Sequence, residues 1–354
     1  MRILFVKLGA IGDIVHALPA LAEVRRRLPD AKVDWVAERG AAEILRDSPA
    51  IDELIEVDTH KIRRSRTPER LISTIKVQAT SLRGRDYDVA IDLQGLWKSA
   101  MIAKISGARR RVGFGRTGLR EPAARVLYTE KVEAPPHINV IDKNLALVRA
   151  ALGLQDDNGG YEYPIHTSVE DRLEAESIVS KATRKFALLN PAGGWETKLW
   201  RAADYGKLAR MLSVEAQLDP IVVTGPGESQ LAQRVIGAAE GVDVIHAEPS
   251  LKGFFELSKR STVYVGGDTG PTHIAVAAGA AVVGIFGPTE WWRNGSPRAD
   301  DICVGRDDIS CRIDCHRRRC SKWICMDIDV ETVFKAIVER TKLARSGTKE
   351  AAVL

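Results

Sequence analysis

The chain has 354 residues, 45% of them hydrophobic, and a formal net charge of +5 at pH 7. This length exceeds that of one typical domain, and the hydrophobic content is typical of a soluble globular protein rather than a disordered one. The length therefore predicts two domains. No run of about 18 apolar residues occurs and the N-terminus lacks a signal-peptide pattern, so we expect a cytosolic protein.

Apolar runs alternate with helical patterns in the first half of the chain. The expected strands are residues 3–6, 32–36, 89–93 and 111–114, and the expected helices include residues 19–28 and 96–105. Such alternation is typical of a parallel sheet with helices on both faces. We therefore predict a doubly wound α/β domain in this half.

A glycine-rich turn follows the first expected strand. Gly9 and Gly12 let the backbone approach a ligand closely, and the helix that begins next offers N–H groups to an anion. Asp13 ends this turn and suits the role of a general base for a substrate hydroxyl. Because aspartate is also a favoured N-cap residue, the residue type alone leaves both roles open.

Basic residues gather in two segments despite the small net charge. They are Lys61, Arg63, Arg64, Arg66 and Arg70 in the first, and Arg109, Arg110, Arg111, Arg116 and Arg120 in the second. Clustered cations favour nucleic acid, an anionic lipid surface or a phosphorylated substrate, and the alternative is an ordinary solvated face. Aromatic residues are not interleaved with them, which argues against a single-stranded nucleic-acid groove.

A stretch rich in Gly, Asp and Asn over residues 151–163 indicates an interdomain linker. A second alternation follows, with expected strands at residues 186–190, 220–224, 242–246, 262–265 and 281–286. We predict a second doubly wound domain from this pattern. Ligands of open parallel sheets bind beyond the carboxyl ends of the strands, so the two domains are expected to hold one in a cleft between them.

Three further glycine-rich turns follow strands of the second half, at residues 190–194, 224–228 and 266–273. Backbone N–H groups at Gly193 and Gly194 suit phosphate oxygens, and Lys198 suits the growing negative charge of a leaving diphosphate. Glu228 suits a ribose hydroxyl or, alternatively, the N-terminus of a helix.

Four of the five cysteines lie close together in a basic segment with few apolar residues. A segment without its own hydrophobic core needs a cross-link to hold its fold. Four thiolates in a cytosolic chain favour a tetrahedral metal ion over disulfides as that cross-link. We therefore predict a structural metal site, for zinc or iron, at Cys311, Cys315, Cys320 and Cys325. His316 is an alternative ligand, and reduced structural thiols are the alternative to a metal.

Five motifs occur in order along most of the chain. They are KLGAIGDIVHALPAL at 7–21, IDLQGLWKS at 91–99, REP at 120–122, GDTGPTH at 267–273 and FGPT at 286–289. Together they resemble the lipopolysaccharide ADP-heptose heptosyltransferases of glycosyltransferase family 9, and most closely heptosyltransferase I. The resemblance implies the GT-B architecture, in which two Rossmann-like doubly wound domains face a central cleft.

The resemblance also implies a domain division. The implied parts are an acceptor-binding domain over 1–160, an ADP-sugar-binding domain over 165–330 with a cysteine-rich insert at 303–326, and a C-terminal helix at 330–345 that packs back on the N-terminal domain.

The activity that the resemblance implies is an inverting transfer of heptose from ADP-L-glycero-D-manno-heptose to the Kdo-lipid A inner core of lipopolysaccharide. No metal or other cofactor is expected to take part in catalysis. The implied partners are the nucleotide sugar ADP-heptose and an anionic glycolipid, and no nucleic acid. The implied location is the cytoplasm, in peripheral association with the cytoplasmic face of the inner membrane.

The resemblance implies roles for the residues of this sequence that match the family's motifs. Asp13 resembles the catalytic base and Lys198 the lysine that faces the diphosphate. The implied donor-binding residues are Gly193, Gly194, Glu228, Asp268, Thr269, Gly270 and His273. The implied acceptor-binding residues are Gly12, Arg63, Arg64, Arg66, Gln94 and Arg120.

Two features depart from the family pattern. Gly193 and Gly194 stand where some relatives carry threonines, so backbone N–H groups would have to contact the phosphates there. The cysteine insert is absent from the simplest heptosyltransferase I sequences and resembles motifs of autotransporter heptosyltransferases that bind a metal. The alternatives are a glycosyltransferase that uses another acceptor, either an inner-core heptose or a protein, one that uses another nucleotide sugar, and a nucleotide-sugar-binding scaffold without turnover.

Overall fold

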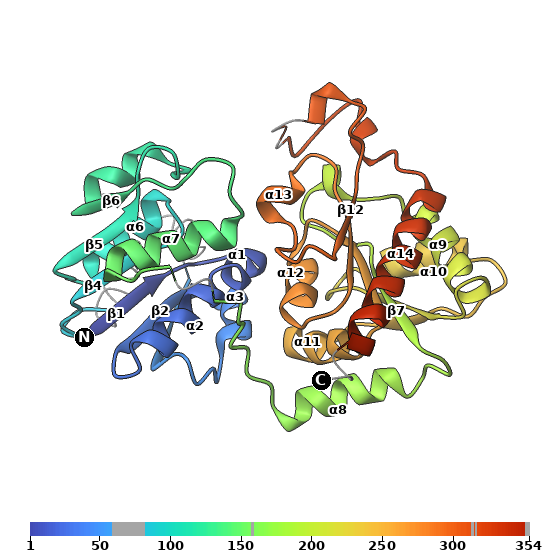
Figure 1. Cartoon of the computed structure of the whole chain (residues 1–354), viewed down its shortest axis with the longest axis horizontal. Helices are drawn as coiled ribbons and strands as arrows, with labels where there is room; N and C mark the ends of the chain where they lie inside the picture. The colour runs from blue at the N-terminus through green and yellow to red at the C-terminus, as the bar shows by residue number, and fades with distance from the viewer. Residues whose placement is uncertain (59–81, 157–158, 313–314, 316, 351–354) are drawn as a thin grey trace, which may run out of the picture. The chain divides into compact units, whose positions relative to one another are not determined.

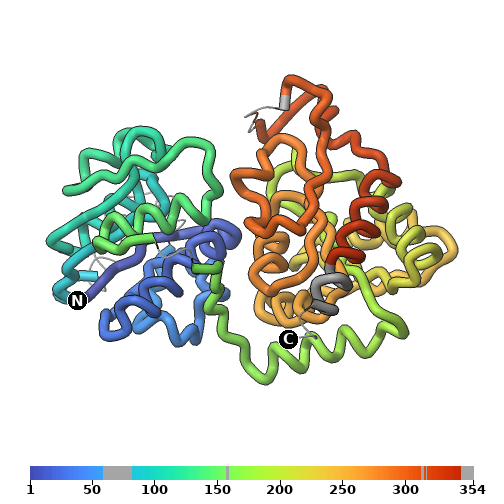
Figure 2. Tube along the Cα trace, viewed as in Figure 1, coloured from blue at the N-terminus to red at the C-terminus, as the bar shows by residue number. Residues whose placement is uncertain are grey.

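The computed structural model describes residues 1–58, 82–156, 159–312, 315 and 317–350 (Figure 1). It divides into two compact units, Met1–His166 and Thr167–Leu354, which follow one another from blue to green and from green to red along the trace (Figure 2). The first unit ends three residues after residue 163, where the predicted linker ends. Arg63, Arg64 and Arg66 lie outside the described residues.

The first unit contains a six-stranded sheet in the order β3-β2-β1-β4-β5-β6, and its described strand pairs are parallel. The strands are β1 (Arg2–Val6), β2 (Lys32–Glu38), β3 (Glu53–Val57), β4 (Val89–Asp92), β5 (Arg110–Phe114) and β6 (Glu130–Val132). Its central strands are fully buried because apolar side chains occupy both faces, as expected where helices cover both sides.

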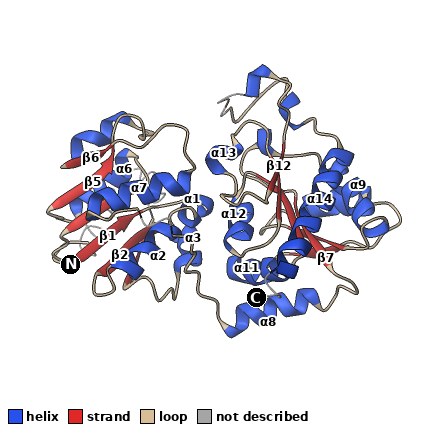
Figure 3. Ribbon diagram, in the orientation of Figure 1, coloured by secondary structure: helices blue, strands red, loops and turns tan. Residues whose placement is uncertain are grey.

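Helices flank the strands of this unit in the ribbon drawing (Figure 3). They are α1 (Ile11–Val15), α2 (Leu18–Arg27), α3 (Arg39–Ala42), α6 (Trp97–Ile105) and α7 (Val140–Leu152). The continuous helical pattern after the first turn is split in the structure, because Pro19 begins a new helix at its first positions. Asn139 caps α7 by accepting a hydrogen bond from Ile141 N, and Gly153 ends it in the left-handed conformation.

The second unit contains another six-stranded sheet, in the order β12-β11-β10-β7-β8-β9, again with parallel pairs. The strands are β7 (Phe186–Asn190), β8 (Asp219–Val223), β9 (Ile245–Ala247), β10 (Val263–Gly267), β11 (Val282–Ile285) and β12 (Ile302–Val304). Counted from its own first strand, this sheet has the same order as the first, 3-2-1-4-5-6, which is the Rossmann arrangement. The predicted doubly wound α/β fold is therefore confirmed for both units.

The helices of the second unit are α8 (Val169–Val179), α9 (Ala202–Val214), α10 (Ser229–Ala238), α11 (Leu251–Arg260), α12 (Gly270–Ala277), α13 (Trp291–Asn294) and α14 (Val330–Glu350). Residues 330–345 are helical as expected, and their packing on the N-terminal domain stays a prediction. Helix α14 packs against α9 and strands β10–β12, because Val333 and Ile337 belong to the hydrophobic core of the second unit. Among the described helices, none is long and apolar enough to cross a membrane.

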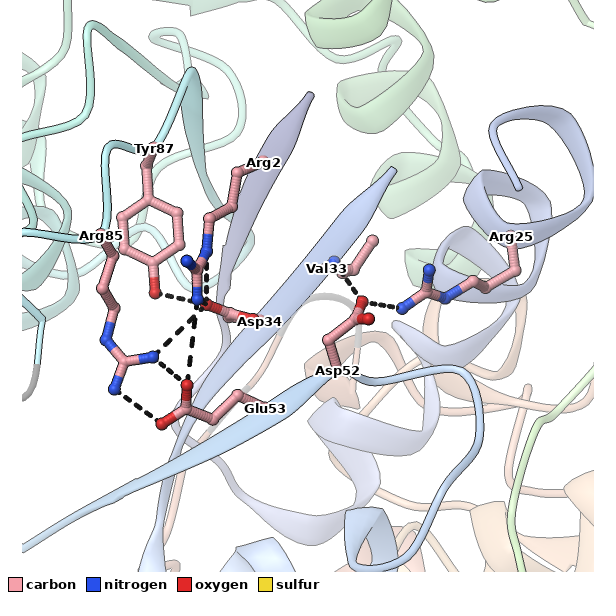
Figure 4. Close-up of polar contacts among 8 residues, drawn as sticks. All are labelled: Arg2, Arg25, Val33, Asp34, Asp52, Glu53, Arg85 and Tyr87. Atoms are coloured by element: carbon pink, nitrogen blue, oxygen red, sulfur yellow. Dashed lines mark hydrogen bonds and ion pairs between the residues drawn. The ribbon is translucent and has the colours of Figure 1, made fainter. Parts of the chain in front are cut away.

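A polar cluster ties together the amino-terminal ends of β1, β2 and β3 (Figure 4). Asp34 is fully buried and accepts hydrogen bonds from Arg2 (2.8 Å) and from the hydroxyl of Tyr87 (2.7 Å). Glu53 pairs with Arg85 beside them. Burial raises the pKa of Tyr87, and its hydrogen bond to the Asp34 carboxylate raises it further. This cluster lies at the opposite ends of the strands from the glycine-rich turns, so we assign it a structural role.

Candidate active site

Each sheet reverses its strand order at one point, between β1 and β4 in the first unit and between β7 and β10 in the second. Chain segments leave such neighbouring strands toward opposite faces, which opens a crevice beyond their carboxyl ends where ligands of this fold bind. The predicted turns at 9–13, 190–194 and 266–273 fall at these two points, and the turn at 224–228 follows the neighbouring strand β8. The two sites are therefore built from the segments that follow β1 and β4, and from those that follow β7 and β10.

Asp13 lies at the first of these points, in the opening turn of α1. Gly9, with φ of 147°, lets the chain leave β1 in a conformation that side chains rarely adopt. The Asp13 carboxylate accepts a hydrogen bond from Ala10 N (3.2 Å), which fixes one of its oxygens at the helix start. Its other oxygen lies 3.5 Å from the guanidinium of Arg120. Gly12 is buried in the same turn.

Gln94, two residues after the end of the neighbouring strand β4, holds this turn. Its side-chain oxygen accepts hydrogen bonds from Leu8 N (3.1 Å) and Gly9 N (3.4 Å), and the residue is 7% exposed. The amide oxygen is thus engaged with the protein backbone beside Asp13. This position gives Gln94 a role in supporting the Asp13 turn, in addition to the acceptor contact that the sequence predicts.

Two buried ionisable residues behind the turn were not predicted. Lys7 donates a hydrogen bond to Leu93 O (2.7 Å), and burial lowers the pKa of its ammonium, while nearby Asp13 acts in the opposite direction. Asp92 accepts hydrogen bonds from Gln94 N (2.9 Å) and from the hydroxyl of Tyr128 (2.6 Å), and burial raises its pKa. Both residues stand at the ends of strands, where an apolar run followed by a charged residue is the only sequence signal.

Lys198 and Asp268 meet at the second point. The Lys198 ammonium lies 2.6 Å from the Asp268 carboxylate and donates a second hydrogen bond to Asp268 O (3.2 Å). His273, on the first turns of α12, lies 3.3 Å from the other carboxylate oxygen. Burial alone would raise the pKa of Asp268, but His273 and Lys198 outweigh it and hold the pKa far below its usual range. Asp268 therefore orients the lysine and the histidine together.

The turns after β7 and β10 approach each other closely. A Cβ added at Gly193 would lie 2.9 Å from the methyl group of Thr269, so only glycine fits there without a shift. Thr269 is the N-cap residue of α12, and Gly270 is the first residue of that helix. Gly194 is exposed. This arrangement brings the predicted phosphate-binding backbone next to the helix N-terminus that would share the anion.

Glu228 lies on the neighbouring turn, at the N-cap position of α10. Its carboxylate accepts a hydrogen bond from Gly225 N (2.8 Å) and so closes the turn that follows β8. The ribose contact stays a prediction, and Glu228 stands at the N-terminus of α10 without a side-chain capping hydrogen bond.

The cysteine-rich segment gives no support for the predicted metal. The described cysteines are free thiols, of which Cys311 and Cys320 are exposed and Cys325 is buried, and the described residues contain no group of three or more side chains placed to hold a metal ion. His316 lies outside the described residues. Hydrogen bonds attach the segment instead: the Thr197 hydroxyl donates to Arg317 O (2.6 Å), and the indole of Trp323 donates to Thr197 O (3.1 Å).

Two Rossmann-like sheets, each with its charged turn at the reversal of strand order, define a GT-B glycosyltransferase fold. The sequence model of glycosyltransferase family 9 (heptosyltransferase) matches residues 77–323, and the chain belongs to that family. It is accordingly a glycosyltransferase.

Relatives and solved structures agree with this assignment. The chain is 28% identical over 309 residues to lipopolysaccharide heptosyltransferase 1 of Pseudomonas aeruginosa, covering 87% of this chain and 84% of that protein. It is 26% identical to the protein of the same name from Escherichia coli K12, covering 82% and 89%. The fold matches the structure of E. coli heptosyltransferase WaaC with ADP at a TM-score of 0.77 and 23% identity, covering 96% of this chain and 100% of that one.

Proposed function

We propose that this protein transfers heptose from ADP-L-glycero-D-manno-heptose to the Kdo-lipid A inner core of lipopolysaccharide, with inversion at the anomeric carbon and without a catalytic metal. The observation that carries the proposal is the placement of Asp13, and of Lys198 with Asp268, at equivalent ligand-binding points of two Rossmann-like units. The names of the relatives, lipopolysaccharide heptosyltransferase 1, supply the sugar and the acceptor class.

The proposed reaction is a single displacement. Asp13 accepts the proton of the acceptor hydroxyl, whose oxygen forms a bond to the anomeric carbon from the face opposite ADP. The bond between that carbon and the β-phosphate oxygen breaks, and its electron pair leaves with ADP. Lys198 and the N-terminus of α12 stabilise the negative charge that develops on the departing diphosphate.

The first experiment replaces Asp13 by Asn and measures heptose transfer to Kdo-lipid A together with ADP affinity. We expect kcat to fall by at least about 100-fold, because a general base contributes on that order, while the Kd for ADP changes little. Asp30→Asn, which alters an exposed carboxylate of the same unit, serves as the matched control. An Asp13→Asn variant with near-normal turnover would remove Asp13 from the role of base.

A second candidate is transfer to a different acceptor. Lipopolysaccharide heptosyltransferase 3 of E. coli is also a relative, at 23% identity over 297 residues in strain K12. Incubation with ADP-heptose and a panel of inner-core acceptors and proteins, followed by mass spectrometry of the products, distinguishes these cases. Release of no ADP with any acceptor would favour a binding scaffold instead of an enzyme.

The proposed location is the cytoplasmic face of the inner membrane, where the protein would contact a lipid acceptor. The basic residues at 61–70, which lie outside the described residues, suggest electrostatic attachment to anionic lipid. Binding to vesicles containing anionic lipid should then weaken as salt is raised. Equal binding to neutral and anionic vesicles would contradict this location.

A further inference from the structure

The cysteine-rich segment lies against the turn that carries Lys198. Its two hydrogen bonds with Thr197, one through Arg317 O and one from the indole of Trp323, join it to the residue next to that lysine. Because Arg317 and Trp323 are both hydrogen-bonded to Thr197, the residues between them lie beside the turn that carries Lys198. Arg318 is one of those residues, and it is exposed.

Arg318 and Lys198 both contact the ring of Trp195. The guanidinium carbon of Arg318 lies 4.9 Å from the centre of the Trp195 ring, and the Lys198 ammonium lies 4.4 Å from that centre. Both distances are within the range of attractive cation–π contacts. The half-buried Trp195, in the segment that follows β7, therefore contacts two cationic side chains.

The charge of Lys198 is already balanced in the protein, because Asp268 lies 2.6 Å from its ammonium. A diphosphate brings two or more negative charges, so one neutralised lysine leaves most of that charge uncompensated. Among the residues that the structure describes, Arg318 forms no ion pair with a carboxylate, and its planar donor fork matches phosphate oxygens.

We infer that Arg318 binds the diphosphate of the sugar nucleotide as a second cation beside Lys198, held in position by Trp195. This inference rests on the proposed function, because it assigns the partner of Arg318 from the donor that Lys198 would face. It gives the cysteine-rich segment a role in donor binding. Arg318 is then expected to contact the β-phosphate end, where Lys198 lies, more than the α-phosphate.

The experiment measures the Kd for ADP and for AMP by calorimetry with the full-length protein and its Arg318→Ala variant. A lost charge-assisted hydrogen bond should raise the Kd for ADP roughly tenfold or more, and the Kd for AMP by less than about threefold. Arg319→Ala removes the next, exposed cation of the same segment and should change neither value. Circular dichroism confirms that each variant is folded, and Arg318→Gln serves in place of the alanine variant if that one is not.

The outcomes separate the two claims. Absence of ADP binding by the unmodified protein would overturn the proposed function, and this inference with it. Normal ADP affinity of the Arg318 variants, with binding by the unmodified protein intact, would overturn the inference alone. Equal losses for ADP and AMP would also overturn it, because Arg318 would then only support the fold of the turn.

Discussion

The turn that presents Asp13 depends on a side chain from another strand. Gln94 accepts hydrogen bonds from two backbone N–H groups of that turn, those of Leu8 and Gly9, which otherwise have to find another acceptor in a buried place. The carboxylate itself is fixed by the backbone of the same turn, at Ala10 N. The position of Asp13 is therefore set by Gln94 through the backbone rather than through direct contact.

Replacing Gln94 by Met tests this support. Methionine keeps the length of the side chain but cannot accept the two hydrogen bonds, so we expect kcat to fall about 10- to 100-fold while the KM for ADP-heptose stays near its normal value. Steady-state kinetics with each substrate varied in turn measures both constants. Gln94→Glu, which keeps an acceptor oxygen, should retain more activity than Gln94→Met. A rise in the KM for ADP-heptose with unchanged kcat would contradict the assignment.

Individual residues differ in how far the sequence could identify them. Asp13 ends one glycine-rich turn after an apolar run and Asp268 lies within another, and this pattern is visible without a structure. Asp92 could not be recognised, because its partner Tyr128 lies 36 positions away and only the fold brings them together. The contact of Arg318 with Trp195 joins two segments with no shared pattern, so no reading of either segment alone predicts it.

Among the elements, the central strands were predicted well, whereas three of the four edge strands were missed and the fourth, β9, was predicted with shifted bounds. Buried strands such as β1, β4, β7 and β10 are continuous apolar runs, which is the pattern that a parallel sheet requires. Strands β3, β6 and β12 have three to five residues and lie at the sheet edges with partly exposed side chains, as the charged sequence EKV of β6 illustrates. The C-terminal helix α14 was predicted as a helix, and its sequence pattern alone does not show which hydrophobic core its apolar face contacts.

Strand β8 begins with a carboxylate that anchors the segment before β7. Asp219 accepts hydrogen bonds from Thr183 N (2.7 Å), Arg184 N (2.9 Å) and the Arg184 guanidinium (2.7 Å). Burial alone would raise the pKa of Asp219, but these hydrogen bonds outweigh it and lower the pKa. The carboxylate therefore stabilises the folded protein when it is ionised.

Replacing Asp219 by Asn should reduce the free energy of unfolding by about 2 kcal/mol at pH 7, because charge-assisted hydrogen bonds are lost. A lowered folded-state pKa means that this stabilisation is complete above the unfolded-state value near 4 and is lost as the pH falls further. The difference between the variant and the unmodified protein should therefore shrink below about pH 4. Urea unfolding at pH 7, 5 and 3.5 measures it. A difference that stays constant across this range would contradict the argument.

At the scale of the whole molecule, each described core cluster takes its residues from one unit. One cluster in the first unit includes Leu4, Val36 and Ala90, and the second unit has a cluster that runs from Ala187 to Ile337. Helix α14 completes the second cluster, so the C-terminal segment belongs to the folding of that unit. A unit with its own hydrophobic core can fold independently.

We therefore expect a fragment of residues 167–354 to fold by itself and to bind ADP. Cooperative thermal unfolding followed by circular dichroism measures the first property, and calorimetry measures the second. The same fragment carrying Lys198→Ala should fold but bind ADP more weakly, because the variant lacks the ammonium group that would bind the diphosphate. A fragment that folds without binding ADP would place essential donor contacts in the first unit.

The shared 3-2-1-4-5-6 strand order is the trace that duplication of one ancestral half-molecule would leave. In that order, Asp92 is the last residue of the fourth strand in the first unit and Asp268 directly follows the fourth strand in the second, and both carboxyl groups are buried. On this view the two copies diverged in their partners. Asp92 accepts hydrogen bonds from a backbone amide and from the Tyr128 hydroxyl, and Asp268 pairs with the ammonium of Lys198. The carboxyl group at the end of the fourth strand would then support a loop in one unit and hold Lys198 in the other.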